Sequence, residues 1–167
     1  MTAQIAQIAV ERFSIVSPLS FESVVSKLEQ GIGRPEIGPL MRKTAAAQTA
    51  AELADLIGEA VGPSGLMEFI RFDLGQVLRK EPEYGSRKCL RLVIGNPLIM
   101  KEMAKHVPDA GSYAPVTVLI DERPDGVHLS YDRMASLLAS YGNPSASQVA
   151  RDLDAKVEAL LRAAASA

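Results

Sequence analysis

Side chains that could bind a metal or a ligand gather in residues 91–106, which read RLVIGNPLIMKEMAKH. Met100, Met103 and His106 follow one another at three-residue spacing, which places neighbouring side chains close together on a helix. Thioether and imidazole groups ligate soft metals and haem iron, so haem or copper binding through these three residues is one hypothesis. Methionines at this spacing also commonly fill a hydrophobic core, and the sequence leaves both readings open.

The same segment contains a Gly95-Asn96-Pro97 corner between a hydrophobic run and the methionine-bearing segment. Asn96 can accept backbone N–H groups of the first helical turn, and Pro97 presets the backbone for a helix start. A helix start at the end of a strand is also a suitable pocket for an anion or a polar ligand. We therefore predict a binding pocket between the sheet and this helix, with Arg91, Asn96, Met100 and Tyr131 near it. The alternative is a capped corner without a ligand.

A cysteine nucleophile is a further possibility, because Cys89 could pair with His106 or His128. However, Cys89 lies in a predicted strand, where a buried and inert thiol is the commoner state. The sequence contains no H-E-x-x-H, G-x-S-x-G, P-loop or G-x-G-x-x-G pattern. No complete catalytic set and no metal or cofactor motif can be assembled from these residues.

The composition limits the classes of partner. The 167 residues are 47% apolar, carry a net charge of −2, and include no Trp and one Cys. This charge gives no general attraction to nucleic acid or to anionic lipid, so neither is expected as a partner. We find no signal peptide and no apolar run long enough for a membrane span, so we expect a cytoplasmic protein.

The elements that must position these residues are predicted from hydrophobic periodicity. Strands are expected at 5–16, 66–72, 87–95, 115–122 and 126–131, the last two joined by an Arg-Pro-Asp-Gly turn. Helices are expected after N-caps at Ser20, Thr49, Asn96 and Asn143, and shorter ones after Asp73 and Asp132. Hairpins mixed with crossovers indicate an α+β fold: a mixed, mainly antiparallel sheet of about five strands, with helices packed mostly on one face. A single domain over residues 1–167 is expected.

Four segments together resemble the domain-of-unknown-function family 302. They are MEFIRFDLG, RLVIGNPLIMKEM, APVTVLIDERPDGVHLSY and DRMASLLA, and they run from about Met67 to Leu138. The resemblance implies a compact α+β domain, often a homodimer, in bacteria and archaea, and it implies no established activity. Residues 34–63, with their extra helix, are longer than the usual link in this family and are expected to be a helical insertion.

Together these observations favour a non-enzymatic domain that binds a small ligand or a partner and acts as a homodimer. The competing hypotheses are an enzyme of unknown reaction that uses Cys89 or His106, and haem or copper binding through Met100, Met103 and His106.

Overall fold

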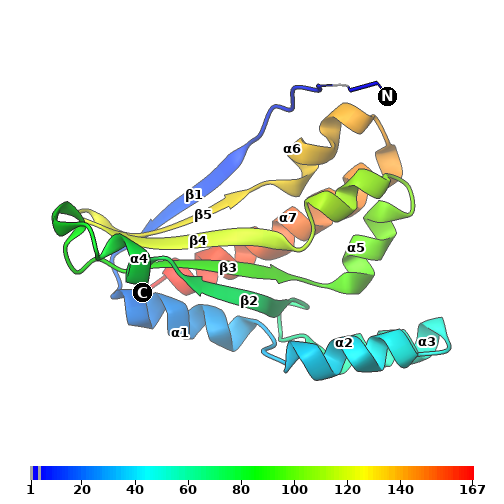
Figure 1. Ribbon diagram of the computed structural model, residues 1–167, viewed down its shortest axis with the longest axis horizontal. Coiled ribbons are helices and arrows are strands. Elements are labelled where there is room, and N and C mark those ends of the chain that lie inside the picture. Colours follow the sequence, from blue (N-terminus) through cyan, green and yellow to red (C-terminus); the bar gives the residue numbers. More distant parts are fainter. Residues whose placement is uncertain (1, 4) are drawn as a thin grey trace.

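The computed structural model describes residues 2–3 and 5–167, and its centre is a five-stranded sheet (Figure 1). The strands lie in the order β1-β5-β4-β3-β2, and all four pairings are antiparallel. Their bounds are β1 Arg12–Ser17, β2 Met67–Asp73, β3 Cys89–Gly95, β4 Val116–Arg123 and β5 Gly126–Asp132. The predicted first strand is shorter than expected because β5, its pairing partner, ends at Asp132 opposite Arg12.

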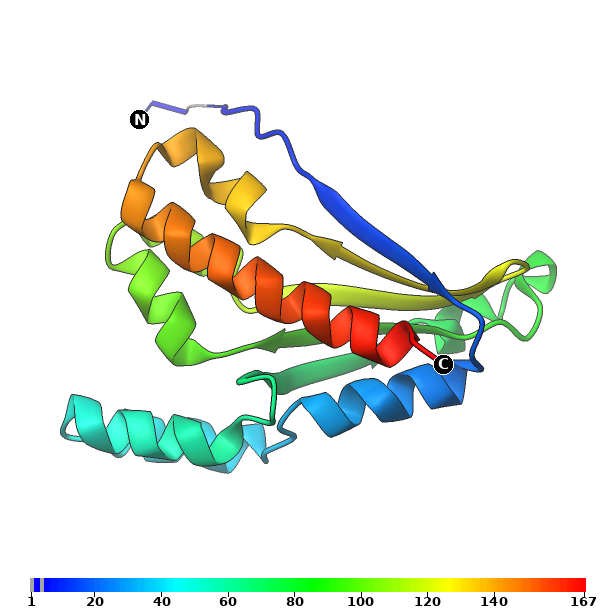
Figure 2. The same ribbon diagram turned by 180° about the vertical axis from the view of Figure 1, so that it is seen from behind.

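The larger helices lie mainly on one face of this sheet (Figure 2). The helices are α1 Phe21–Gly31, α2 Ile37–Ala46, α3 Ala50–Ala60, α4 Gly75–Leu78, α5 Pro97–Ala104, α6 Met134–Leu138 and α7 Pro144–Ala165. Short 3₁₀ turns occur at Pro82–Tyr84, Pro108–Ser112 and Ala139–Tyr141. The predicted α+β fold is therefore confirmed.

The main core lies between the sheet and the helices α1 and α7. Alternate residues of each central strand point toward these helices, as the two-residue period of a strand requires. Leu92 of β3, Val118 of β4 and Leu129 of β5 are completely buried there. From the helices, Leu28 and Val157 meet them in the same cluster.

All four predicted N-caps of the longer helices form. The side chains of Ser20, Thr49, Asn96 and Asn143 each accept a backbone N–H of the first turn. Asp132 is different: its carboxylate pairs with Arg12 at 2.6 Å and does not cap α6. The first amides of α6 instead donate to Asp154 of α7, so the expectation for Asp132 was wrong. The position of Asp132 as the last residue of β5 explains this, because its side chain lies beside Arg12 of the paired strand.

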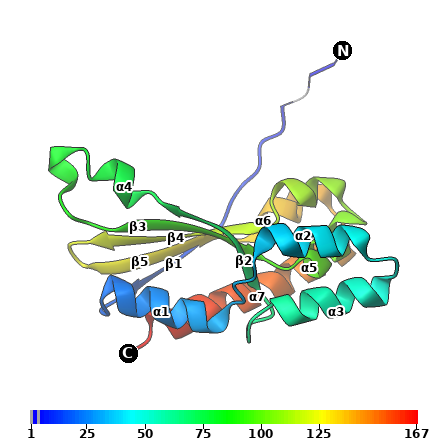
Figure 3. The same ribbon diagram turned by 60° about the horizontal axis from the view of Figure 1, so that its bottom comes forward.

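Helices α2 and α3 form a hairpin that projects from the body beside α5 (Figure 3). Its two connections to the body cross at Gly33 and Gly62, whose amides both donate to the Leu66 carbonyl at 2.9 Å. The backbones are so close that a Cβ on Gly62 would lie 2.7 Å from the Ile32 Cα. The base of the hairpin is therefore fixed by direct backbone packing, and the two helices extend away from it.

Helices α1 and α7 do not cover the opposite face of the sheet, which is called the open face below. Its side chains include Val16, Ile70 and Phe72, which are 41–46% exposed. Within the described part of the chain, no helix combines the length and the apolar character that a membrane span requires.

Candidate functional site

The Asn96 corner is a tightly bonded junction. Asn96 Oδ1 accepts the Leu98 amide at 2.8 Å, and its Nδ2 donates to the Gly65 carbonyl at 2.9 Å. The first bond caps α5, and the second ties the start of α5 to the turn before β2. Because both ends of this amide are engaged, Asn96 fixes the position of α5, and one N–H and one lone pair of its amide remain for a ligand.

Beside this corner lies a cavity of about 440 Å³, between the α2–α3 hairpin on one side and α5 with the sheet end on the other. Helices α2 and α3 provide one wall, through Ile37, Leu40, Met41, Thr44, Ala45, Leu53 and Ile57. The opposite wall comes from β2, β3, α5, β4 and α7, through Met67, Phe69, Gly95, Asn96, Pro97, Ile99, Met100, Met103, Ala114, Pro115, Val116 and Leu153. The cavity, with the residues of both walls, is here called the hairpin cavity.

The walls of the hairpin cavity are almost entirely apolar. None of its lining residues is ionisable, and Thr44 and Asn96 contribute the polar side chains. The Thr44 hydroxyl donates to the Met41 carbonyl at 3.1 Å, so its hydrogen is already used within α2. Several wall residues, including Ile37, Leu53 and Met100, remain only partly buried although they face the cavity. The site therefore offers a large apolar surface and almost no unsatisfied polar groups.

Two of the four predicted ligand residues, Asn96 and Met100, line the hairpin cavity. Arg91 does not line the cavity. Its neighbours in β3, Leu90 and Leu92, point toward α1 and α7, so Arg91 points to the opposite, open face of the sheet. There its guanidinium lies 5.8 Å from the centre of the Phe72 ring. The corner and the methionine helix thus line this cavity, whereas Arg91 does not contribute to it.

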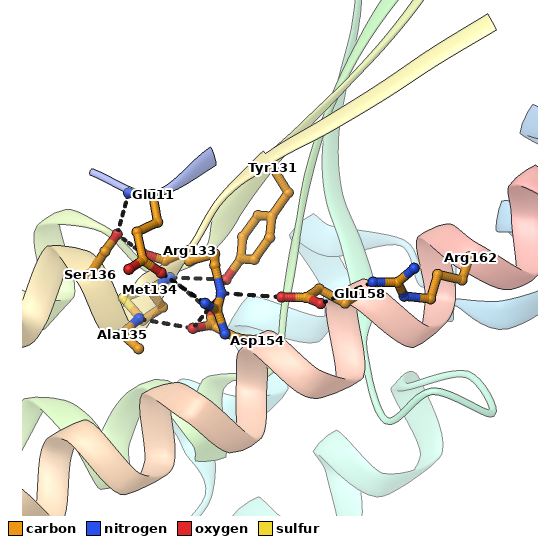
Figure 4. A network of polar contacts seen from close by, with 9 residues as sticks. All are labelled: Glu11, Tyr131, Arg133, Met134, Ala135, Ser136, Asp154, Glu158 and Arg162. Atoms are coloured by element: carbon orange, nitrogen blue, oxygen red, sulfur yellow. Dashed lines mark hydrogen bonds and ion pairs between the residues drawn. The ribbon is translucent and has the colours of Figure 1, made fainter. Parts of the chain in front are cut away.

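Tyr131, the fourth predicted residue, is buried in a polar network at the start of α6 (Figure 4). Its hydroxyl donates to Asp154 Oδ1 at 2.6 Å. The same carboxylate accepts the Met134 amide at 2.7 Å and the Ala135 amide at 3.1 Å. Burial raises the pKa of Tyr131, and the bond to Asp154 raises it further. The Tyr131 hydroxyl is thus a neutral donor that holds a structural carboxylate.

Arg133 extends this network to the surface. Its guanidinium lies 3.1 Å from Glu158 and 2.8 Å from Glu11, and 3.8 Å from the buried Asp154 carboxylate. The cation therefore offsets part of the charge on Asp154. Together these contacts tie β5 and α6 to α7, and they lie apart from the hairpin cavity.

The three candidate metal ligands are only partly brought together. Met100 and Met103 line the hairpin cavity, together with Met41 and Met67. His106 lies beyond the end of α5, is exposed, and is not one of the cavity's lining residues. Among the described residues, no group of three or more His, Cys, Asp and Glu side chains is arranged to hold a metal ion. Haem or copper binding through this trio remains a prediction without added support.

Cys89 is buried at the start of β3, the end of the strand remote from α5 and His106. Burial raises the pKa of its thiol, and the charge of Asp121 raises it further. Cys89 of β3 pairs with Asp121 of β4, and Asp121 pairs with His128 of β5. Strand β4 therefore lies between the Cys89 and His128 side chains. His128 itself contacts Asp125 at 2.8 Å. The structure therefore does not assemble a Cys–His pair, whose members must lie within hydrogen-bond reach.

The wall that α2 and α3 contribute to the cavity was not predicted from the sequence. The signal was present in residues 37–45: Ile37, Leu40, Met41, Thr44 and Ala45 follow the i, i+3, i+4, i+7, i+8 pattern of one helical face. Asp154 was also missed, although it lies next to Leu153 within the apolar stripe of the last helix.

Comparisons with known proteins agree with this fold. A family model described as "Domain of unknown function DUF302" matches residues 41–164, a range that begins within α2 and includes four of the five strands. The crystal structure of an uncharacterized conserved DUF302 protein from Bacillus stearothermophilus is similar over 92% of this chain and 97% of that chain. The TM-score is 0.62 and the sequence identity is 10%, so this likeness shows a shared fold alone. A search of curated proteins finds no match.

Proposed function

The chain belongs to the DUF302 family of domains of unknown function, and we propose that it serves as a binding domain for a small molecule. The proposed site is the hairpin cavity. The observation that carries the proposal is the presence of about 440 Å³ of apolar space beside the start of α5. This volume lies within the range of roughly 300–1,000 Å³ that is usual for small-molecule sites.

The partly buried wall residues become fully buried when a ligand enters, and this burial favours binding. Removing apolar surface from water contributes about 25 cal/mol for each Å². The wall is formed by side chains from six different elements, so it exists before any ligand arrives. A preformed apolar cavity needs little ordering on binding, which favours affinity.

Blocking the hairpin cavity tests this proposal. We expect Met100→Trp to weaken the binding of phenylnaphthylamine, a neutral fluorescent dye, at least tenfold, because the indole occupies space that the dye needs. The matched control is Met100→Leu, which nearly conserves volume and should leave the affinity within about threefold. Dye titration measures both, and circular dichroism checks that each variant is folded. Equal affinity of folded Met100→Trp and the unchanged protein would contradict this site.

A second copy of the chain is the partner we propose for the open face of the sheet. Antiparallel sheets often expose one face to water, but that face is then usually polar. Here Ile70 and Phe72 expose apolar surface beside the half-buried Val93 and Leu119. Two acidic groups at the rim are neutralised within the chain, by Arg12–Asp132 and Arg123–Asp121 contacts of 2.6 Å each. Two copies can therefore face each other across a two-fold axis with little repulsion from these paired rim charges.

Light scattering on a sizing column tests this homodimer. We expect the mass of two chains for the unchanged protein, and of one chain for Phe72→Lys, because the new ammonium would lie beside Arg91 and two like charges would be buried at the contact. Ala155→Lys is the control, because Ala155 is exposed on α7, which lies on the other side of the sheet. A monomer at all concentrations, or equal dissociation of both variants, would contradict the proposal.

We further propose that residues 1–167 act as one domain in the cytoplasm. The single cysteine, which cannot form an intrachain disulfide, supports a reducing compartment. The expected insertion at residues 34–63 becomes, in this proposal, the segment that makes the ligand site.

A further inference from the structure

We infer that the molecule held in the hairpin cavity is uncharged and predominantly hydrocarbon. This inference rests on the proposed binding function and names the chemical class of the ligand. It follows from the side chains of the two walls together with the state of their polar groups.

The first step concerns charge. No lining residue of the hairpin cavity carries an ionisable side chain. A carboxylate or an ammonium group inside would therefore lose its water without gaining a partner of opposite charge. Burying such an unpaired ion is strongly unfavourable, so the walls select against charged ligands.

The second step concerns hydrogen bonds. The two polar side chains of the cavity are Thr44 and Asn96. Asn96 already accepts from the Leu98 amide and donates to the Gly65 carbonyl, which leaves one N–H and one lone pair of its amide. Thr44 donates its hydrogen to the Met41 carbonyl, so its hydroxyl can only accept from a ligand. A ligand with several buried polar groups would leave most of them unsatisfied, at about 1–3 kcal/mol for each.

The third step concerns size and adaptability. A volume of about 440 Å³ corresponds to about 15 atoms at the roughly 30 Å³ that one water occupies in the liquid. Four of the lining residues are methionines, from α2, β2 and α5. Methionine is unbranched and polarisable, and surfaces rich in it adapt to different apolar shapes. A hydrocarbon chain or ring system of this size therefore suits the site.

Three ligands that differ only in their head group test the inference: decanol, decanoate and decylammonium. Each has fewer non-hydrogen atoms than the cavity can hold, so the whole molecule fits between the walls. Competition with phenylnaphthylamine is measured near neutral pH, where the acid and the amine are both charged. We expect decanol to bind at least tenfold more tightly than either charged analogue, and Met100→Trp to abolish this binding.

The outcomes separate the two proposals. If a charged analogue binds as tightly as decanol and Met100→Trp abolishes that binding, the ligand class is wrong while the binding site stands. If decanol binds tightly but Met100→Trp has no effect, binding occurs elsewhere and both the site and the inference fail. If neither the dye nor any of the three analogues binds, the proposed function itself is overturned.

Discussion

Replacing Asp154 by alanine is expected to lower the free energy of unfolding by about 3–5 kcal/mol, because several buried or partly buried donors lose an acceptor and each such loss costs about 1–3 kcal/mol. The change leaves the Ala135 amide and the Tyr131 hydroxyl without their acceptor, and the Met134 amide keeps only its bond of 3.2 Å to the Tyr131 hydroxyl. The Tyr131 hydroxyl and the Met134 amide are buried at the start of α6, and the Ala135 amide is partly buried beside them (Figure 4). Urea unfolding followed by circular dichroism measures the loss.

The control for this prediction is Asp152→Ala on the same helix. Asp152 is exposed and accepts a hydrogen bond from Gln148. Its removal should change the stability by no more than about 0.5 kcal/mol, as is usual for surface sites. Tyr131→Phe should lie between the two, because it removes one of the three donors to Asp154. A loss below 1 kcal/mol for Asp154→Ala would show that the network does not stabilise the fold.

Replacing Gly62 by alanine is expected to destabilise the protein by about 3 kcal/mol and to weaken dye binding in the hairpin cavity. The new Cβ would lie 2.5 Å from the Gly33 nitrogen and 2.7 Å from the Ile32 Cα. These are backbone atoms, which cannot move aside as the end of a flexible side chain can. The two connections must separate, and overpacking of this kind costs about 1–3 kcal/mol or more. Thermal unfolding and dye titration measure the two effects.

Gly58 offers the opposite result with the same substitution. It lies within α3, and a Cβ added there would meet nothing within 4 Å. Gly58→Ala should therefore stabilise the protein by about 0.5–1 kcal/mol, because alanine loses less conformational freedom in a helix. Equal stability of the Gly62→Ala and Gly58→Ala variants would show that close backbone packing at Gly33 and Gly62 does not fix the hairpin.

Local signals predicted the secondary structure well because they act over a few residues. Ser20, Thr49, Asn96 and Asn143 were identified as N-caps from their position before an apolar pattern, and each one caps its helix. A cap needs only its own first turn. Runs of apolar and β-branched residues bounded by turn residues likewise located the central strands.

Features that join distant segments were predicted less well. The helix at Pro97 was expected to border a pocket together with the sheet, and the cavity beside it has a facing wall from α2 and α3 that was not expected. Arg91 was assigned to the pocket because it is near Asn96 in sequence, although its strand turns it to the other face. Tyr131 was assigned without knowledge of Asp154, which is 23 residues away. An acidic residue inside an apolar helical stripe was the signal that a buried partner existed.

Helix α2 contains no fully buried residue, yet five of its side chains face the hairpin cavity. Substitutions on α2 should therefore lower the free energy of unfolding only slightly while changing which ligand the hairpin cavity binds. Evolution, or a protein engineer, could exchange Ile37, Leu40 or Met41 almost independently of the rest of the molecule. A library confined to these positions would be a practical route to receptors with new selectivity on an unchanged scaffold.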